Sequence, residues 1–192
     1  MIKRIDEFIK RAFDTATKHG FHDKKTSVEH QLMLVISEIG EAVEADRKNL
    51  HANLAGFDKC VGIEYSQRFK DYVKDSVEDE LADVCIRIFD MCGCFGIKPY
   101  RSYEEILTLR DDWKQEFGRM TFTEQAYSLV QMLTSWPPTD VNSVSGVLSH
   151  VFGAALFFIH YWTLEMGIDL ARHIELKMEF NESRQRLHGK KY

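Results

Sequence analysis

The sequence predicts an all-α protein folded as a helical bundle, and two observations support this class. Through one central stretch, apolar residues recur at alternating spacings of four and three, which is the pattern of a helix packed along its length. The positions in that stretch are Val77, Leu81, Val84, Ile88, Met91 and Phe95. The chain of 192 residues also has only three prolines, and no run alternates apolar and polar residues as a half-buried strand would.

Glycines, prolines and polar stretches divide the chain into its predicted helices. We expect helices at about 2–18, 28–48, 67–95, 102–117, 122–135, 144–166 and 169–186. The breaks between them are Gly20, the stretch 51–62, Gly96 to Pro99, Gly118 and Trp136 to Pro138. Ser27 and Thr121 directly precede two of these helices, and their hydroxyl side chains suit the N-cap position.

The length and the 44% hydrophobic content predict a single domain over residues 1–192. We expect an acidic half at about 1–100 and a second half, with a basic C-terminal helix, at about 101–192. When Val77 is aligned with Leu148, every position of the apolar stripe stays apolar, but the acids of the first half are not repeated. This indicates a degenerate internal duplication, although helical periodicity alone could produce the same match.

The second half is also rich in aromatic residues, and the sequence leaves two roles open for them. Phe157, Phe158, Tyr161 and Trp162 lie on the helix expected at 144–166. They could line a pocket for a nucleotide base, but core packing is the commoner role for aromatic residues at helical spacing.

Two predicted helices carry acidic pairs inside apolar runs. Glu38 and Glu41 are three residues apart on one helix, and Glu80 and Asp83 have the same spacing on another. Carboxylates at this spacing are neighbours and repel each other unless a cation lies between them. Four such groups could surround one or two hard divalent cations, whereas the alternative is a solvated acidic face with pairs such as Asp83 to Arg87.

The last predicted helix is basic. Lys177, Asn181 and Arg184 are spaced so that all three lie on one helix stripe, where two cations and an amide could bind phosphate oxygens. The alternative is a solvated basic helix end that the helix dipole favours.

Charge and hydropathy exclude several classes of partner. With a net charge of −5, the chain is not expected to bind nucleic acid. Its most apolar segment, 151–164, is interrupted by His160 and is shorter than the ~20 residues of a bilayer span, so no membrane partner is expected. The four cysteines lack C-x-x-C spacing and are expected to be reduced thiols of a soluble, cytoplasmic protein.

Together these motifs resemble a known family. Ser37 to Glu41 and Glu80 to Asp83 are similar to the E-x-x-E and E-x-x-D signature of MazG-like, all-α nucleoside triphosphate pyrophosphohydrolases, which include dimeric dUTPases and dCTP pyrophosphatases. The chain from Gly167 to Lys191, with Lys177, Asn181 and Arg184, resembles the family's C-terminal helix and tail. The chain departs from the family at Ser37, where many members have a further Glu, and in the long segment at about 100–145.

The resemblance implies a Mg²⁺-dependent enzyme, with Mn²⁺ as a substitute, that hydrolyses (deoxy)nucleoside triphosphates to the monophosphate and pyrophosphate. Glu38, Glu41, Glu80 and Asp83 would bind the metal, and Glu38 or Glu41 would take the proton of the attacking water. Lys177, Asn181 and Arg184 would bind the small-molecule nucleotide. The site could be built from one chain or from a homodimer.

Two other interpretations are alternatives to a nucleotide pyrophosphohydrolase. A di-iron carboxylate bundle would also be helical, but it normally uses Glu-x-x-His pairs, which neither Glu38 nor Glu80 begins. The second alternative is a catalytically degenerate helical module that binds a nucleotide or another protein without turnover.

Overall fold

A computed structural model describes residues 1–99, 118–135 and 144–189, and these residues form helices and no strands. The helices are η1 (Ile2–Arg4), α1 (Ile5–Lys18), α2 (Val28–Arg47), α3 (Leu54–Lys59), α4 (Tyr65–Tyr72), α5 (Val77–Phe95), α7 (Phe122–Thr134), α8 (Val144–Glu165), α9 (Leu170–Glu182) and η2 (Arg186–Gly189). The all-α class predicted from the sequence is confirmed. The helix predicted at 102–117 lies outside the described residues.

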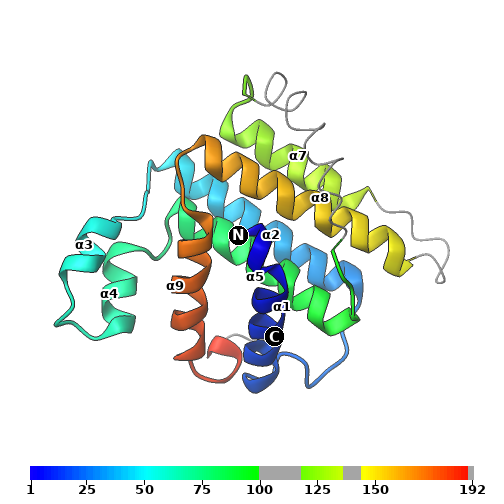
Figure 1. Cartoon of the computed structure of the whole chain (residues 1–192), viewed down its shortest axis with the longest axis horizontal. Helices are drawn as coiled ribbons and strands as arrows, with labels where there is room; N and C mark the ends of the chain where they lie inside the picture. Colours follow the sequence, from blue (N-terminus) through cyan, green and yellow to red (C-terminus); the bar gives the residue numbers. More distant parts are fainter. Residues whose placement is uncertain (100–117, 136–143, 190–192) are drawn as a thin grey trace.

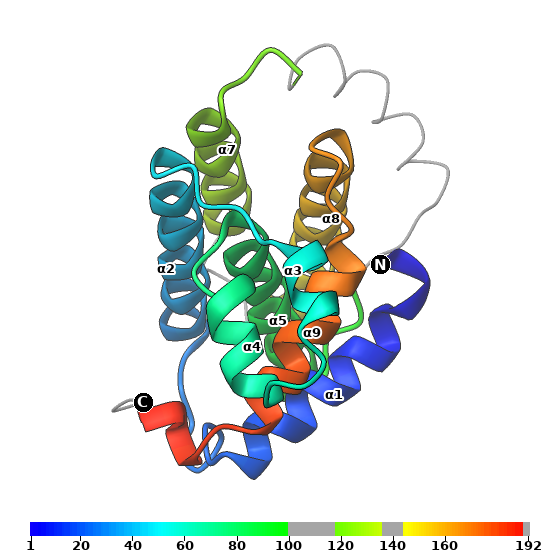
Figure 2. The same ribbon diagram turned by 90° about the vertical axis from the view of Figure 1, so that its left-hand side faces the viewer.

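Helix α5 is the centre of the bundle. It packs against α1, α2, α8 and α9, and α7 packs against both α2 and α8 (Figure 1). Its predicted stripe is buried, since Val77, Leu81, Val84 and Ile88 are fully inaccessible to solvent. Figure 2 shows α2 and α7 on one side of α5 and α1 on the other. Because α5 is covered on so many sides, polar groups at its N-terminal end are buried as well.

The sequence analysis was wrong about the single helix predicted at 67–95, which is two helices. Helix α4 ends at Tyr72, and Asp75 then adopts a left-handed backbone conformation with φ 61°. Ser76 begins α5 as its N-cap, because its hydroxyl accepts a hydrogen bond from the Asp79 backbone N–H at 3.2 Å. The break places Asp75 beside Asp79, whose Oδ2 accepts the Asp75 N–H at 3.0 Å.

The stretch 51–62 was predicted as a break but contains the short helix α3, which Asn53 caps. Helices α3 and α4 pack together and lie beside α9 (Figure 1). They enclose a second, smaller core that includes Phe57, Phe69 and Phe180. This small core covers the side of α9 on which Lys177 lies, since the Lys177 ammonium is 5.7 Å from the centre of the Phe69 ring.

Helices α1 and α5 approach closely at Gly93. A Cβ atom on Gly93 would lie 2.5 Å from the Cβ of Phe13, so no larger residue fits there without a shift. One turn earlier on α5, Phe89 stacks on Phe8 of α1 with ring centres 5.7 Å apart. This contact fixes α1 along one side of α5 and shapes the space between α1 and α9.

Helix α8 is a core helix in this bundle. Phe157, Phe158, Tyr161 and Trp162 are all buried, which is the packing role rather than the pocket role. Ser145–Glu165 is long and apolar enough to cross a membrane by length and composition, but 56% of its most apolar window is buried inside the protein. Burial of this kind is what the core helix of a soluble protein shows.

Candidate metal centre and adjoining cavity

Three of the predicted acids meet where α2 faces the first turns of α5. Carboxylate oxygens of Glu38, Glu41 and Glu80 lie within 4.8 Å of one another. Glu38 and Glu80 are buried, whereas Glu41 is exposed at the edge of the group. A single chain therefore brings these acids together, and association into a homodimer stays a prediction. We call Glu38, Glu41 and Glu80 the carboxylate cluster.

The fourth predicted acid, Asp83, is turned toward α9. Its Oδ2 lies 2.7 Å from the Nζ of Lys177. Asp83 is not a member of the carboxylate cluster, whose oxygens lie within 4.8 Å of one another. Asp83 is three residues after Glu80 on α5, so it stays next to the cluster. In this conformation it faces a protein cation instead of the other predicted ligands.

Asp79 is a site residue that the sequence analysis missed. Its side chain is fully buried, and both carboxylate oxygens lie 2.8 Å from the Lys177 ammonium. The signal in the sequence was the spacing of Asp79 and Asp83, which are four residues apart and so repel without a cation. The cation itself could not be identified from the sequence, because Lys177 lies on another helix.

Lys177 is buried between these two acids. Burial works to lower the pKa of its ammonium, but the Asp83 and Asp79 carboxylates raise the pKa above the usual value for lysine. The Lys177 ammonium is therefore charged and paired with Asp79 and Asp83. Contact with phosphate, the role predicted from the sequence, would require the ammonium to leave both carboxylates.

Burial raises the pKa values of the acids around this centre. It raises the pKa of Glu80 to about 8, with Lys177 opposing the shift and Asp79 and Asp83 adding to it. Burial also raises the pKa of Glu38, and the neighbouring Asp83 adds to the shift. Burial raises the pKa of Asp79 to about 6 against the effect of Lys177. Burial thus makes the ionised form of these carboxyl groups costly, and the nearby cations offset only part of that cost.

Arg87 compensates one of these acids. Its guanidinium lies 2.5 Å from Oε1 of Glu38, and its side chain is about one quarter exposed. The sequence offered a pair between Asp83 and Arg87 on the same helix as an alternative, but the structure pairs Arg87 with α2. Only Oε1 of Glu38 takes part in this contact.

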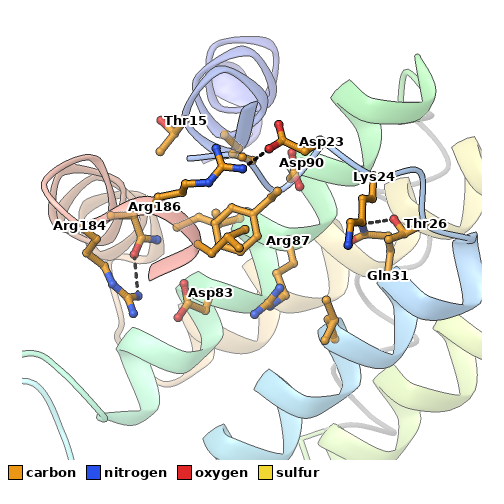
Figure 3. A pocket seen from close by; sticks show the side chains of 18 of the residues that line it. Thr15, Asp23, Lys24, Thr26, Gln31, Asp83, Arg87, Asp90, Arg184 and Arg186 are labelled. Carbon is orange, nitrogen blue, oxygen red and sulfur yellow. Dashed lines mark hydrogen bonds and ion pairs between the residues drawn. The ribbon is translucent and has the colours of Figure 1, made fainter. Parts of the chain in front are cut away.

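A cavity of about 540 Å³ adjoins the cluster. It lies between the end of α1, the turn that follows, α2, α5 and α9 (Figure 3). Asp83 and Arg87 form its α5 wall, and Asn181 and Arg184 contribute from α9. Figure 3 shows Arg184 near Asp83 on one side of the cavity and Lys24 on the other.

Cations from distant parts of the chain converge on this cavity. They are Lys24, Arg87, Arg184 and Arg186. Burial lowers the pKa of Arg184, while Asp83 and Asp79 oppose that shift. Arg186 reaches across to pair with Asp23 in the turn after α1, which closes one edge of the cavity. The sequence analysis predicted Asn181 and Arg184 as binding residues but not Lys24, Arg87 or Arg186.

The donor set of the carboxylate cluster fits a hard divalent cation. All three side chains supply oxygen, which is the ligand that Mg²⁺ and Mn²⁺ prefer, and no histidine belongs to the groups found in the described part of the chain. Glu80 is buried and forms no side-chain hydrogen bond or ion pair with any described residue. A cation would supply the partner that its carboxylate lacks.

Comparison of the chain with models of protein families, with curated proteins and with solved structures gives no match. The class of protein is thus defined by the fold and the site alone. It is an all-α bundle in which a carboxylate cluster with two buried members adjoins a cavity lined by both cations and aspartates.

Proposed function

We propose that this protein is a Mg²⁺-dependent hydrolase that converts (deoxy)nucleoside triphosphates to the monophosphate and pyrophosphate. The observation that carries the proposal is that the carboxylate cluster adjoins a cavity to which four cations contribute, Lys24, Arg87, Arg184 and Arg186. Arg87 pairs with Glu38 of the cluster and also lines the cavity, and Asp83, three residues after Glu80, lines it as well. A volume of about 540 Å³ lies within the usual range for small-molecule sites.

Each part of a metal-bound triphosphate has a counterpart in this arrangement. Glu38, Glu41 and Glu80 would hold Mg²⁺, or Mn²⁺ in its place, which supplies charge neutralisation and an acidic bound water when present. Arg184 and Arg186 line the cavity and are suited to bind phosphate oxygens. The rest of the cavity, between α1 and the N-terminal part of α2, has room for the nucleoside.

Glu41 is our choice for the group that accepts the proton of the attacking water. Its carboxylate is the exposed member of the cluster, whereas Oε1 of Glu38 is already bound by Arg87. A general base must reach the water and be free to take its proton, and Glu41 meets both conditions better than Glu38.

Pyrophosphate is the leaving group in this scheme. Arg184 and Arg186 would neutralise the outer phosphates, so these phosphates can leave together as one unit. Lys177 acts indirectly by holding Asp79 and Asp83 in place. Water should therefore attack the α-phosphorus.

The test is turnover of a panel of nucleoside triphosphates with Mg²⁺ in ¹⁸O-labelled water. We expect release of pyrophosphate, with the label in the monophosphate. Glu80→Gln should abolish turnover, and Arg184→Ala should raise KM. Glu44→Gln is the matched control, because Glu44 is on the same helix as Glu38 but faces Arg47 and Lys48.

Two results would contradict the proposal in different ways. Label in orthophosphate, with the diphosphate as co-product, would show attack on the γ-phosphorus. Nucleotide binding without any turnover would support the alternative of a catalytically degenerate binding module.

A further inference from the structure

Acidic side chains near the start of α5 form two groups, and the groups share Glu80. The first is the carboxylate cluster of Glu38, Glu41 and Glu80. In the second, oxygens of Asp75, Asp79 and Glu80 also lie within 4.8 Å of one another. By side-chain type alone, either group could hold a cation. The two groups differ in which carboxylates are still available.

In the second group, a cation of the protein already occupies the carboxylate of Asp79. The Lys177 ammonium lies 2.8 Å from both oxygens of Asp79 and 2.7 Å from Oδ2 of Asp83. The contacts with Oδ2 of Asp79 and Oδ2 of Asp83 have the distances of charge-assisted hydrogen bonds, whereas Oδ1 of Asp79 belongs to the ion pair but accepts no hydrogen bond. One nitrogen thus contacts three carboxylate oxygens, as a bound cation would. The backbone N–H of Asp75 adds a further donor to Asp79 at 3.0 Å.

The surroundings of Lys177 keep the ammonium there. Lys177 is 5% exposed, and its ammonium lies over the Phe69 ring, 5.7 Å from the ring centre. Phe69 stacks on Phe180 with ring centres 4.4 Å apart, so this wall is closed by two rings. On the side of Phe69, an ammonium leaving the two aspartates would enter an apolar core, which is strongly unfavourable.

The carboxylate cluster is different, because Arg87 leaves room for a second cation at Glu38. Arg87 contacts only Oε1 of Glu38, and its side chain is 26% exposed toward the cavity. Glu80 has no such partner, and Glu41 is exposed. A divalent ion can therefore join this group without displacing a buried charge.

We propose that Lys177 permanently takes the place of a second metal ion, so that each chain binds one divalent cation. This inference rests on the proposed function for the metal bound by Glu38, Glu41 and Glu80. It assigns the second positive charge near the substrate to the protein. Lys177 is then a positioning residue, which keeps Asp83 oriented beside the cavity and acts on the reaction through the acids.

The test is the number of Mn²⁺ ions bound by the full chain, measured by calorimetric titration and by the paramagnetic resonance of free Mn²⁺. We expect one ion per wild-type chain and none with Glu80→Gln. Lys177→Met removes the ammonium and keeps an apolar side chain of similar length. It should gain a second bound ion, whereas the charge-conserving Lys177→Arg should keep one.

Asp79→Asn provides a test that does not depend on the folding of the Lys177 variants. If Lys177 excludes metal from Asp79, this change should leave the Mn²⁺ stoichiometry at one. Two ions in the wild type, loss of an ion with Asp79→Asn, or one ion in a folded Lys177→Met variant would each overturn the inference. Two ions with pyrophosphate release would leave the proposed function standing. If no ion were bound and no pyrophosphate were released, both the inference and the proposed function would be wrong.

Discussion

Glu80 is the residue whose environment conflicts most with its charge. It is 4% exposed, and burial raises its pKa to about 8. A carboxyl group whose pKa is raised on folding destabilises the folded state as pH rises from the unfolded value, and the penalty is complete above the folded pKa. At neutral pH without metal, the Glu80 carboxyl therefore costs stability, which a bound cation would restore.

We therefore predict opposite effects of Glu80→Gln with and without metal. In EDTA at about pH 8, the variant should be more stable than the wild type by about 1–3 kcal/mol, which raises Tm by several degrees for a chain of this size. Added Mg²⁺ or Mn²⁺ should raise Tm of the wild type but not of the variant. Thermal unfolding followed by circular dichroism measures both, and an unchanged wild-type Tm on adding metal would argue against the cluster as a metal site.

His22 provides a second residue whose charge depends on pH. Its Nε2 lies 3.0 Å from Oδ1 of Asp90, and its ring stacks on Phe13. The hydrogen bond to Asp90 raises the pKa of His22, while burial opposes the shift. The resulting stability is present below the unfolded pKa of histidine and is lost as pH rises through the folded value.

His22→Gln should therefore destabilise the protein more in acid than in base. We expect a loss of up to ~1 kcal/mol at about pH 5.5 and a smaller loss at about pH 8.5. Urea unfolding at both pH values gives the comparison. Equal losses at the two pH values would refute the assignment.

The spacing of acids in the sequence was enough to predict the carboxylate cluster but not the ion pairs around it. Glu38, Glu41 and Glu80 stand in apolar runs, where a carboxylate needs a partner, and that requirement can be recognised in the sequence. The partner of Asp79 and Asp83 is Lys177, which follows Asp79 by 98 residues. A contact over that separation depends on how α9 packs against α5, which local patterns do not determine.

Among the helices, the close approach of α1 and α5 gives a direct test of the packing. Gly93→Ala would place a Cβ atom 2.5 Å from Phe13, so we expect it to destabilise the protein by about 1–3 kcal/mol. Gly40→Ala is the matched control, since a Cβ on Gly40 of α2 meets nothing within 4 Å. There, the better helix propensity of Ala should stabilise the protein by up to ~1 kcal/mol.

Chemical unfolding of both variants at one pH would measure the difference. If Gly93→Ala were as stable as Gly40→Ala, α1 could not lie against α5 as described. Both changes replace glycine by alanine within a helix, so propensity and unfolded-state effects largely cancel in the comparison.

Helix starts were predictable where a capping side chain was present. The predicted N-caps Ser27 and Thr121 are confirmed, because the Ser27 hydroxyl accepts from the His30 N–H and Thr121 forms a capping box with Glu124. The break between α4 and α5 was missed. It depends on the left-handed backbone of Asp75, and aspartate gives a weaker signal for that conformation than glycine.

Across the whole molecule, one apolar core joins both halves of the chain. Its buried members run from Ile5 in α1 to Met178 in α9 and include Leu148 and Phe152 in α8. The first and last α-helices also meet, since Arg11 of α1 pairs with Glu182 of α9 at 2.6 Å. The two halves therefore share their packing, whether or not they arose by duplication.

Shared packing predicts cooperative unfolding. Urea transitions followed by far-ultraviolet circular dichroism and by aromatic signals should coincide, with a single midpoint. Backbone amides of α5 and α8 should exchange with solvent at similarly slow rates. Two separate transitions, with α8 exchanging much faster than α5, would show that the second half has an independent core.

The contact of Lys177 with Asp79 and Asp83 also has a consequence for the synthesis of the chain. A ribosome completes α5 long before α9, and nascent chains begin to fold from the N-terminal side. Until α9 emerges, Asp79 and Asp83 lie one turn apart on α5 with no ammonium between them. The ion pairs of Asp79 and Asp83 can therefore form only after Lys177 has been synthesised, and a chain interrupted before that residue would lack them.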